Sequence, residues 1–380
     1  MENLNYFPNA NPLTNNPRRS LMYYSGIDLH KNMCMITTLN EAGVTLKQTR
    51  LPNDGYSILN YFFSMGKEHK AVVESTTNWY WLSDLLHDHQ IDLTLAHAKK
   101  LKAISCAKVK TDKYDSHTLA QLLRLNLIPV AHQINPNLRG PRDLMRSRLK
   151  LVCKKTSCLN SIHRILEKFN LDPLDNHDID DLTDPASLNQ LNLNPQYHLQ
   201  ISMLQEQIKL IEKQILHLEK SLHPLLIPND DVQILLQLPG IGKILAFTIY
   251  LEIDGSNRFK DIKNFYSYCR LAPGADNSNR KIKHKSGSKE GNPYLKFAFT
   301  EAAFRAIQHY PEIRQFYKNK LRKKPIGIAR TLVAKELAKM CYYLLKYKTD
   351  YNNTFKGIKL SKPKAQSWPR LTSPEKGLEN

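Results

Sequence analysis

The stretch SGIDLHKNMCMITTLNEAGVTLKQTRL, residues 25–51, decides the fold at the start of this chain. Residues 23–29 and 33–39 are apolar or β-branched runs, and the turn-forming residues 40–43 (NEAG) separate them from a third run, 44–51. Short runs of this composition, divided by turn residues, are typical of neighbouring antiparallel strands. The sequence therefore predicts a three-stranded antiparallel opening.

Helical and extended patterns alternate after this opening. The sequence predicts helices at residues 56–65 and 79–86, strands at 71–73 and 93–96, and a last helix in DSHTLAQLLRL, 115–125. Three strands followed by helix, strand, helix, strand and helix is the order of an RNase H-like fold. We therefore expect an α/β domain over residues 22–134.

Four acidic residues stand at the ends of these predicted elements: Asp28, Glu74, Asp112 and Asp115. The first two end strands, and strand ends are where open sheets build their sites. Asp112 and Asp115 are three apart at the start of a helix and so share one face. One such acid alone is more often a surface or capping residue, but four together predict a site for Mg²⁺ or Mn²⁺.

The charge of the chain indicates its class of partner. Its 380 residues include 55 Lys and Arg against 35 Asp and Glu, a net charge of +20, which favours DNA or RNA over a small acidic substrate. A basic peripheral membrane protein is the alternative, but the positive charge is spread along the chain. No apolar stretch reaches the ~18 residues of a membrane span. The polar residues 1–21 lack the apolar core of a signal peptide, so we expect a disordered leader and a cytoplasmic protein.

Residues 135–228 are helical and charged in pattern. A 3-4-3-4 spacing of apolar residues forms a seam of Ile201, Leu204, Ile208, Ile211, Ile215, Leu218 and Leu222. Isoleucine dominates one seam position, which favours a two-stranded coiled coil and hence a homodimer or tetramer. A hairpin with the preceding basic helix, within one chain, is the alternative.

The stretch PGIGK, residues 239–243, separates two further helical segments, 232–238 and 244–253. Helix, glycine turn and helix predict a helix-hairpin-helix, whose backbone N–H groups bind phosphate. Gly240, Gly242 and Lys243 are the candidate contacts. The same glycines also suit a tightly packed helical turn, and both interpretations stay open.

A basic, glycine-marked stretch, residues 271–296, holds a further candidate, Ser278. A loop serine is ordinarily a turn residue, so its surroundings carry the argument. The cations beside it are suited to a phosphate backbone; they are Arg280, Lys281, Lys283, Lys285 and Lys289.

Several motifs together resemble one family: GIDLHK, VVEST, KTDKYDSHTLAQLL, the LPGIGK block and SGSKEGNPYLK. They are similar to DEDD-type insertion-sequence transposases, the insertion-sequence one-ten family, which includes the Piv-type DNA invertases. The resemblance covers residues 25–345. It implies a RuvC-like catalytic domain, a coiled-coil region, a C-terminal transposase domain at 229–346 and a basic tail at 347–380.

The resemblance also implies roles. Asp28, Glu74, Asp112 and Asp115 become the metal-binding tetrad and Ser278 the nucleophile of a transposase that cuts and rejoins DNA, guided by a bridge RNA in the bacterial nucleoid. One departure concerns the nucleophile: family members often carry paired serines and glycines there, whereas Asn277 and Asn279 flank Ser278. Ser286 and Ser288 on the same stretch are therefore alternative nucleophiles.

Two other functions fit parts of the pattern. A RuvC-like DNA junction endonuclease needs only the acidic tetrad and water, and for that enzyme Ser278 is dispensable. A non-catalytic nucleic-acid-binding protein needs neither, but the presence of all four acids disfavours it.

Overall fold

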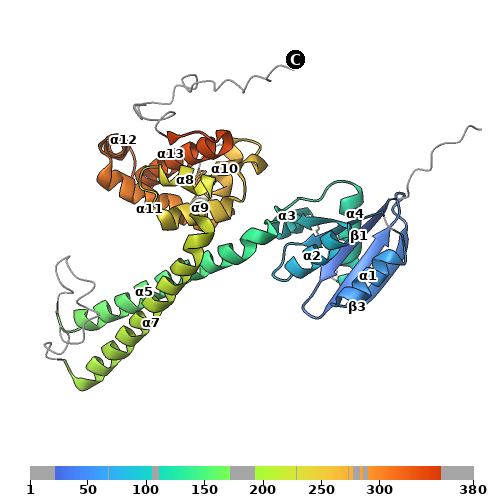
Figure 1. Ribbon diagram of the computed structural model, residues 1–380, viewed down its shortest axis with the longest axis horizontal. Helices are drawn as coiled ribbons and strands as arrows, with labels where there is room; N and C mark the ends of the chain where they lie inside the picture. The colour runs from blue at the N-terminus through green and yellow to red at the C-terminus, as the bar shows by residue number, and fades with distance from the viewer. Residues whose placement is uncertain are drawn as a thin grey trace, which may run out of the picture. The chain divides into compact units, whose positions relative to one another are not determined.

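The computed structural model describes residues 22–66, 68–104, 111–171, 193–227, 229–272, 274–276, 283–285 and 290–351. The chain divides into two compact units, Met1–Gln133 and Ile134–Asn380 (Figure 1). The division lies beside residue 134, where the sequence places the end of the α/β domain. The other predicted domain limits, at residues 21, 228 and 346, stay predictions.

A five-stranded sheet forms the centre of the first unit. Its strands are β1 (Tyr23–Leu29), β2 (Met33–Leu39), β3 (Thr45–Pro52), β4 (His69–Glu74) and β5 (Asp92–Ala96). They lie in the order β3-β2-β1-β4-β5. The first three pair antiparallel, as predicted, whereas β4 runs parallel to both β1 and β5. This mixed sheet is compatible with an RNase H-like fold.

Helices cover both faces of this sheet; they are α1 (Gly55–Phe63), α2 (Tyr80–Asp88), α3 (Ala98–Ile104) and α4 (Asp112–Arg124). Successive strand residues point to opposite faces. Ile27 and Val73 accordingly pack in one core with α1 and α2. Val72, from the same strand as Val73, packs in another core with α3 and α4. The unit is therefore layered, with α4 on the face opposite α1 and α2.

Gly26 sets how closely α4 approaches β1. A Cβ atom at Gly26 would lie 2.1 Å from the Ser116 carbonyl oxygen and 2.5 Å from the Ala120 nitrogen, so only glycine fits. A buried hydrogen bond of 2.7 Å between the hydroxyls of Thr37 and Ser116 fixes the position of the helix along the sheet. The start of α4 is thereby held against the end of β1.

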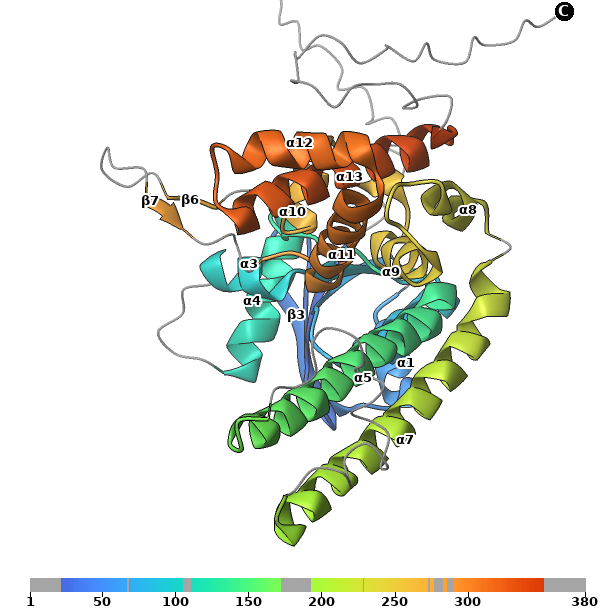
Figure 2. The same cartoon turned by 90° about the vertical axis from the view of Figure 1, so that its left-hand side faces the viewer.

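Two long helices, α5 (Pro136–Glu167) and α7 (Pro195–Leu226), run antiparallel and side by side in the second unit (Figures 1 and 2). The seam residues Ile201 and Ile208 are buried here against Ile162 of α5. Two ion pairs join the helices, Arg148–Glu219 at 2.7 Å and Lys155–Glu212 at 2.6 Å. The predicted seam of α7 therefore packs against α5 in a helical hairpin within one chain, as in the alternative interpretation. Pairing of this seam between two chains stays a prediction.

The rest of the second unit is mostly helical, as predicted. Its elements are α8 (Asp230–Leu236), α9 (Lys243–Ile253), η2 (Ser256–Arg258), α10 (Ile262–Tyr268), β6 (Gly274–Asp276), β7 (Lys283–Lys285), α11 (Pro293–His309), α12 (Pro311–Leu321) and α13 (Ile326–Tyr347). Helix α9 is apolar on nearly all sides and lies in the core that α11 and α13 complete (Figure 2). Within the part of the chain that the structure describes, no helix combines the length and apolar character of a membrane span.

The PGIGK turn joins α8 to α9. Gly240 has a φ of +75°, and a Cβ there would lie 2.2 Å from the Ala302 carbonyl oxygen of α11. Packing against α11 therefore accounts for this glycine. Gly242 and Lys243 are exposed at the start of α9, with open space around Gly242. Phosphate binding at this turn stays a prediction.

Candidate functional site

Asp28 and Asp112 come together at the end of β1. Asp28 lies two residues after Gly26 and so faces α4. Asp112 and Asp115 are in the first turn of α4, which Thr111 caps by accepting a hydrogen bond from the Tyr114 N–H. Since α4 rests directly on Gly26, its first turn reaches the end of the strand. The structure brings Asp28 and Asp112 together at this point, and their role as metal ligands stays a prediction.

His30 lies between the two carboxylates. Its Nε2 is 3.2 Å from Asp28 Oδ2 and 3.3 Å from Asp112 Oδ1. The His30 carbonyl accepts hydrogen bonds from the side-chain amides of Asn53 at 2.8 Å and Asn78 at 2.7 Å, which hold this residue in place. Sequence reasoning missed His30. Its signal was the two-residue spacing from Asp28 at a strand end.

Asp28, His30 and Asp112 are here named the acidic corner. The electrostatics of the acidic corner favour a bound cation. Burial raises the pKa of the Asp28 carboxyl; His30 opposes that rise, and the neighbouring charges of Asp112 and Asp115 add to it. Burial, with the charges of Asp28 and Asp54, also raises the pKa of the Cys34 thiol to about 11. Negative charge is therefore concentrated beyond the end of β1, where a bound cation would relieve the repulsion.

Glu74 lies at the end of β4, the parallel neighbour of β1. Ile27 pairs with Val73, so Asp28 and Glu74 are the next residues along the two strands. Both therefore belong to the same edge of the sheet and to the face that α4 covers. The structure places Glu74 at the predicted edge, half-buried.

The donors at this corner fit a divalent metal ion. Asp28, His30 and Asp112 each offer one ligand atom, and these atoms lie within 4.8 Å of one another. Carboxylate oxygens are the donors that Mg²⁺ and Mn²⁺ prefer, and imidazole is compatible with Mn²⁺. Burial is the main cause of the raised pKa of Asp28, and the charges of Asp112 and Asp115 add to it; a bound cation would favour the ionised carboxylate.

Residues 271–296, here named the serine-bearing stretch, are described only in part by the structure. Ser278, the alternatives Ser286 and Ser288, and the cations Arg280, Lys281 and Lys289 lie outside the described residues. Lys283 and Lys285 belong to β7, which pairs antiparallel with β6. The structure therefore does not test these assignments, which stay predictions.

The C-terminal end of this stretch is firmly anchored at Gly291 and Asn292. Gly291 has a φ of +98°, and a Cβ there would lie 2.6 Å from the Tyr268 carbonyl oxygen. The Asn292 N–H donates to that same oxygen at 2.6 Å, and the Asn292 side chain caps α11 by accepting from the Leu295 N–H. These contacts fix the position of the chain where α11 begins.

The buried carboxylate of Glu252, on α9, accepts a hydrogen bond from Asn292 and so holds this residue in place. It accepts hydrogen bonds from Arg142 at 2.7 Å, from Arg146 at 2.6 Å and from the Asn292 side chain at 2.7 Å, and it is only 2% exposed. Burial by itself raises the pKa of the Glu252 carboxyl. The hydrogen bonds and charges of Arg146 and Arg142, with the Asn292 hydrogen bond, outweigh burial and leave that pKa below its ordinary value.

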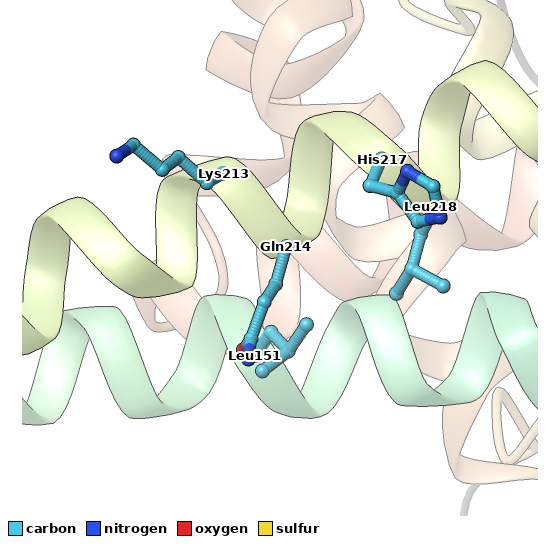
Figure 3. A pocket seen from close by; sticks show the side chains of 5 residues that line it. All are labelled: Leu151, Lys213, Gln214, His217 and Leu218. Atoms are coloured by element: carbon cyan, nitrogen blue, oxygen red, sulfur yellow. The ribbon is translucent and has the colours of Figure 1, made fainter.

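A separate pocket lies between the long helices of the second unit. Figure 3 shows that it is lined by Leu151 of α5 and by Lys213, Gln214, His217 and Leu218 of α7. The Gln214 side chain points toward Leu151, whereas Lys213 points away from α5. None of these five residues is a carboxylate, so the pocket does not repeat the acidic site of the first unit.

Comparison with known proteins gives matches over both units. A DEDD transposase model of the IS110 type matches residues 25–171, and a model described as "Transposase IS116/IS110/IS902 family" matches residues 232–318. A transposase for insertion sequence element IS1111A from Coxiella burnetii (strain RSA 493 / Nine Mile phase I) is 19% identical over 321 residues, covering 84% of this chain and 85% of the relative. A probable family 20 transposase from Pseudomonas aeruginosa is 22% identical over 289 residues, with coverages of 72% and 82%.

Proposed function

Because this chain belongs to the IS110 family of transposases, we propose that it moves an insertion sequence by cutting and rejoining DNA through a metal-assisted serine nucleophile. The observation that carries the proposal is the meeting of Asp28, His30 and Asp112 at the end of β1. This meeting lies inside the segment that matches the DEDD transposase model.

The acidic residues act as ligands. Asp28, Glu74, Asp112 and Asp115 hold the divalent ion, and His30, which contacts two of these carboxylates, orients them. A bound Mg²⁺ or Mn²⁺ supplies charge stabilisation to the oxygens of the phosphodiester. The two side-chain amides on the His30 carbonyl keep this arrangement rigid.

Ser278 is the proposed nucleophile. Its hydroxyl oxygen attacks phosphorus, the P–O3′ bond breaks, and the products are a 5′-phosphoserine ester and a free 3′-OH. The phosphate backbone is held by the cations of the same stretch and by the PGIGK turn; these residues are Arg280, Lys281, Lys283, Lys285, Lys289, Gly240, Gly242 and Lys243. The cytoplasm, with the nucleoid as its DNA, is the proposed place of action, and a homodimer or tetramer the proposed assembly.

We further propose that a bridge RNA from the element selects the DNA. The net charge of +20 supports a polyanionic partner, and the sequence lacks zinc-finger spacing for direct base reading. Base pairing then supplies specificity while the protein holds backbones. In vitro recombination of the element's end with its target is expected only when this RNA is present. Exchanging the guide loops of the RNA should move the target in step.

The result that contradicts RNA guidance is specific recombination by protein, DNA and Mg²⁺ after complete RNase digestion. A chain that recombines in that way is a transposase that reads DNA directly. A RuvC-like junction endonuclease remains the second candidate, since the acidic corner alone supports hydrolysis by water. Such an endonuclease differs from the proposed transposase because it forms no covalent bond between protein and DNA.

A further inference from the structure

The turn between α12 and α13 is a strongly basic exposed surface outside the stretch that contains Ser278. Residues 318–330, KNKLRKKPIGIAR, are here named the basic turn. It carries Lys318, Lys320, Arg322, Lys323, Lys324 and Arg330. No Asp or Glu occurs between Glu312 and Glu336, so the sequence places no acid beside these cations.

Among the described residues, no acidic side chain neutralises the charge of the basic turn. Within the residues that the structure describes, its cations form no ion pair, whereas Arg148 and Lys155 of α5 are paired with Glu219 and Glu212. Arg322, Lys323 and Lys324 are consecutive and exposed. Like charges held this closely attract a polyanion.

The turn presents its charges on an ordered backbone. The Arg322 N–H donates to the Lys318 carbonyl at 3.3 Å and the Lys323 N–H to the Lys320 carbonyl at 3.1 Å. Lys320 lies over the Phe316 ring, 4.9 Å from its centre. The backbone of the turn therefore loses little conformational entropy when it binds a partner.

The other side chains of the turn favour a duplex over unpaired bases. Ile326 and Ile328 are 56% and 51% exposed, and the basic turn contains no aromatic residue. Unpaired bases are bound by stacking on aromatic rings, which are missing from this stretch. Cations with aliphatic side chains suit the phosphates and sugars of a double helix.

We propose that the basic turn is a second nucleic-acid contact of this protein and binds the phosphate backbone of duplex DNA. It is separate in sequence from the acidic corner, from the PGIGK turn and from the serine-bearing stretch. The inference rests on the proposed function only in taking DNA as the partner. Its role is to position the duplex, since backbone contacts carry no base sequence.

The test is the salt dependence of binding. The triple variant Arg322→Gln, Lys323→Gln, Lys324→Gln and the unchanged protein are titrated with a fluorescent duplex of arbitrary sequence in EDTA, over a range of KCl concentrations. Each lost phosphate contact lowers the slope of log K against log [salt] by about 0.9, so we expect a slope smaller by about 2 to 3 and binding at least ~10-fold weaker at low salt.

A matched control removes the same charge elsewhere. Lys209, Lys213 and Lys220 are exposed on α7, and replacing all three by Gln changes the net charge equally. We expect the control to retain the slope of the unchanged protein. An unchanged slope in the basic-turn variant, or an equal loss in the control, overturns the proposal. Weaker binding of duplex RNA with unchanged binding of DNA overturns it as well.

The assay is independent of catalysis. Binding in EDTA does not require cleavage, so an inactive protein that still shows the expected slope change contradicts the proposed function and supports the basic turn. Thermal unfolding of each variant checks that the fold is retained. An Arg322→Lys variant, which keeps the charge, is expected to keep the slope.

Discussion

Asp28→Asn is expected to lower DNA strand cleavage by at least ~10³-fold, which corresponds to about 4 kcal/mol of lost transition-state stabilisation. Asp28 is the residue of the corner that contacts His30 from the strand side, and an amide is a weaker ligand for a hard cation than a carboxylate. Because burial raises the pKa of Asp28, with a further rise from the charges of Asp112 and Asp115, removing its negative charge stabilises the folded state. The melting temperature should therefore stay constant or rise.

Asp54→Asn is the matched control. Asp54 also contributes negative charge near Cys34, but it caps α1 by accepting from the Ser57 N–H at 2.7 Å, and asparagine caps a helix equally well. We expect this variant to cleave at the unchanged rate. The measurement is single-turnover cleavage of a labelled duplex carrying the element's end, with the proposed RNA and Mg²⁺. Cleavage by Asp28→Asn at the rate of Asp54→Asn would show that the acidic corner is not the metal site.

The largest effect on stability is expected for Glu252→Gln. Two arginines and Asn292 converge on this buried carboxylate, and the variant leaves their positive charge without a counter-charge. Breaking a buried ion pair by removing one partner costs about 3–5 kcal/mol. The check is the midpoint of urea unfolding, followed by a probe in the second unit.

Glu219→Gln is the control for that experiment. Glu219 also pairs with an arginine of α5, Arg148, at 2.7 Å, but its side chain is 31% exposed. A pair open to solvent contributes about 0–1 kcal/mol, so a small shift is expected. Equal shifts for the two variants would contradict the special role given to Glu252.

The effect of Glu252 should also depend on pH. Its pKa is depressed in the folded state, so it stabilises the fold above the pKa of an unfolded glutamate, about 4.3, and this stability is lost as pH falls through the folded value. The difference in unfolding midpoint between the unchanged protein and Glu252→Gln should therefore be full at pH 7 and shrink below pH ~4. A difference that is constant from pH 7 to pH 3 would assign the effect to packing.

Much of the first unit follows from local sequence signals. The strands Tyr23–Leu29 and Met33–Leu39 have the predicted bounds, because apolar alternation and the turn at residues 40–43 specify them without distant contacts. Asp28 and Asp112 were predictable as partners once their strand and helix were known. Chain order then determines which ends lie together.

Contacts across long distances in sequence were not predictable. Arg142 is 110 residues from Glu252, and nothing local in the basic stretch of α5 indicates that its charge is used inside the chain. Gly240 has the sequence of a phosphate-binding turn, but its close approach to Ala302 is visible only in the folded chain. His30 could not be singled out from the sequence, because a histidine after a strand is commonly an ordinary surface residue. Its contact with Asp112 exists only in the folded chain, where α4 brings the two residues together.

We propose that a serine of this chain becomes covalently joined to DNA with the help of the acidic corner. The most direct measurement is denaturing electrophoresis of labelled duplex after reaction with protein, the proposed RNA and Mg²⁺. We predict a protein-linked DNA band that is lost in EDTA, in Asp28→Asn and in Ser278→Ala, and kept in Ser286→Ala and Ser288→Ala. Cut DNA with no protein-linked band, even in a rapidly quenched reaction, would contradict the account and assign the chemistry to water, as in a junction endonuclease.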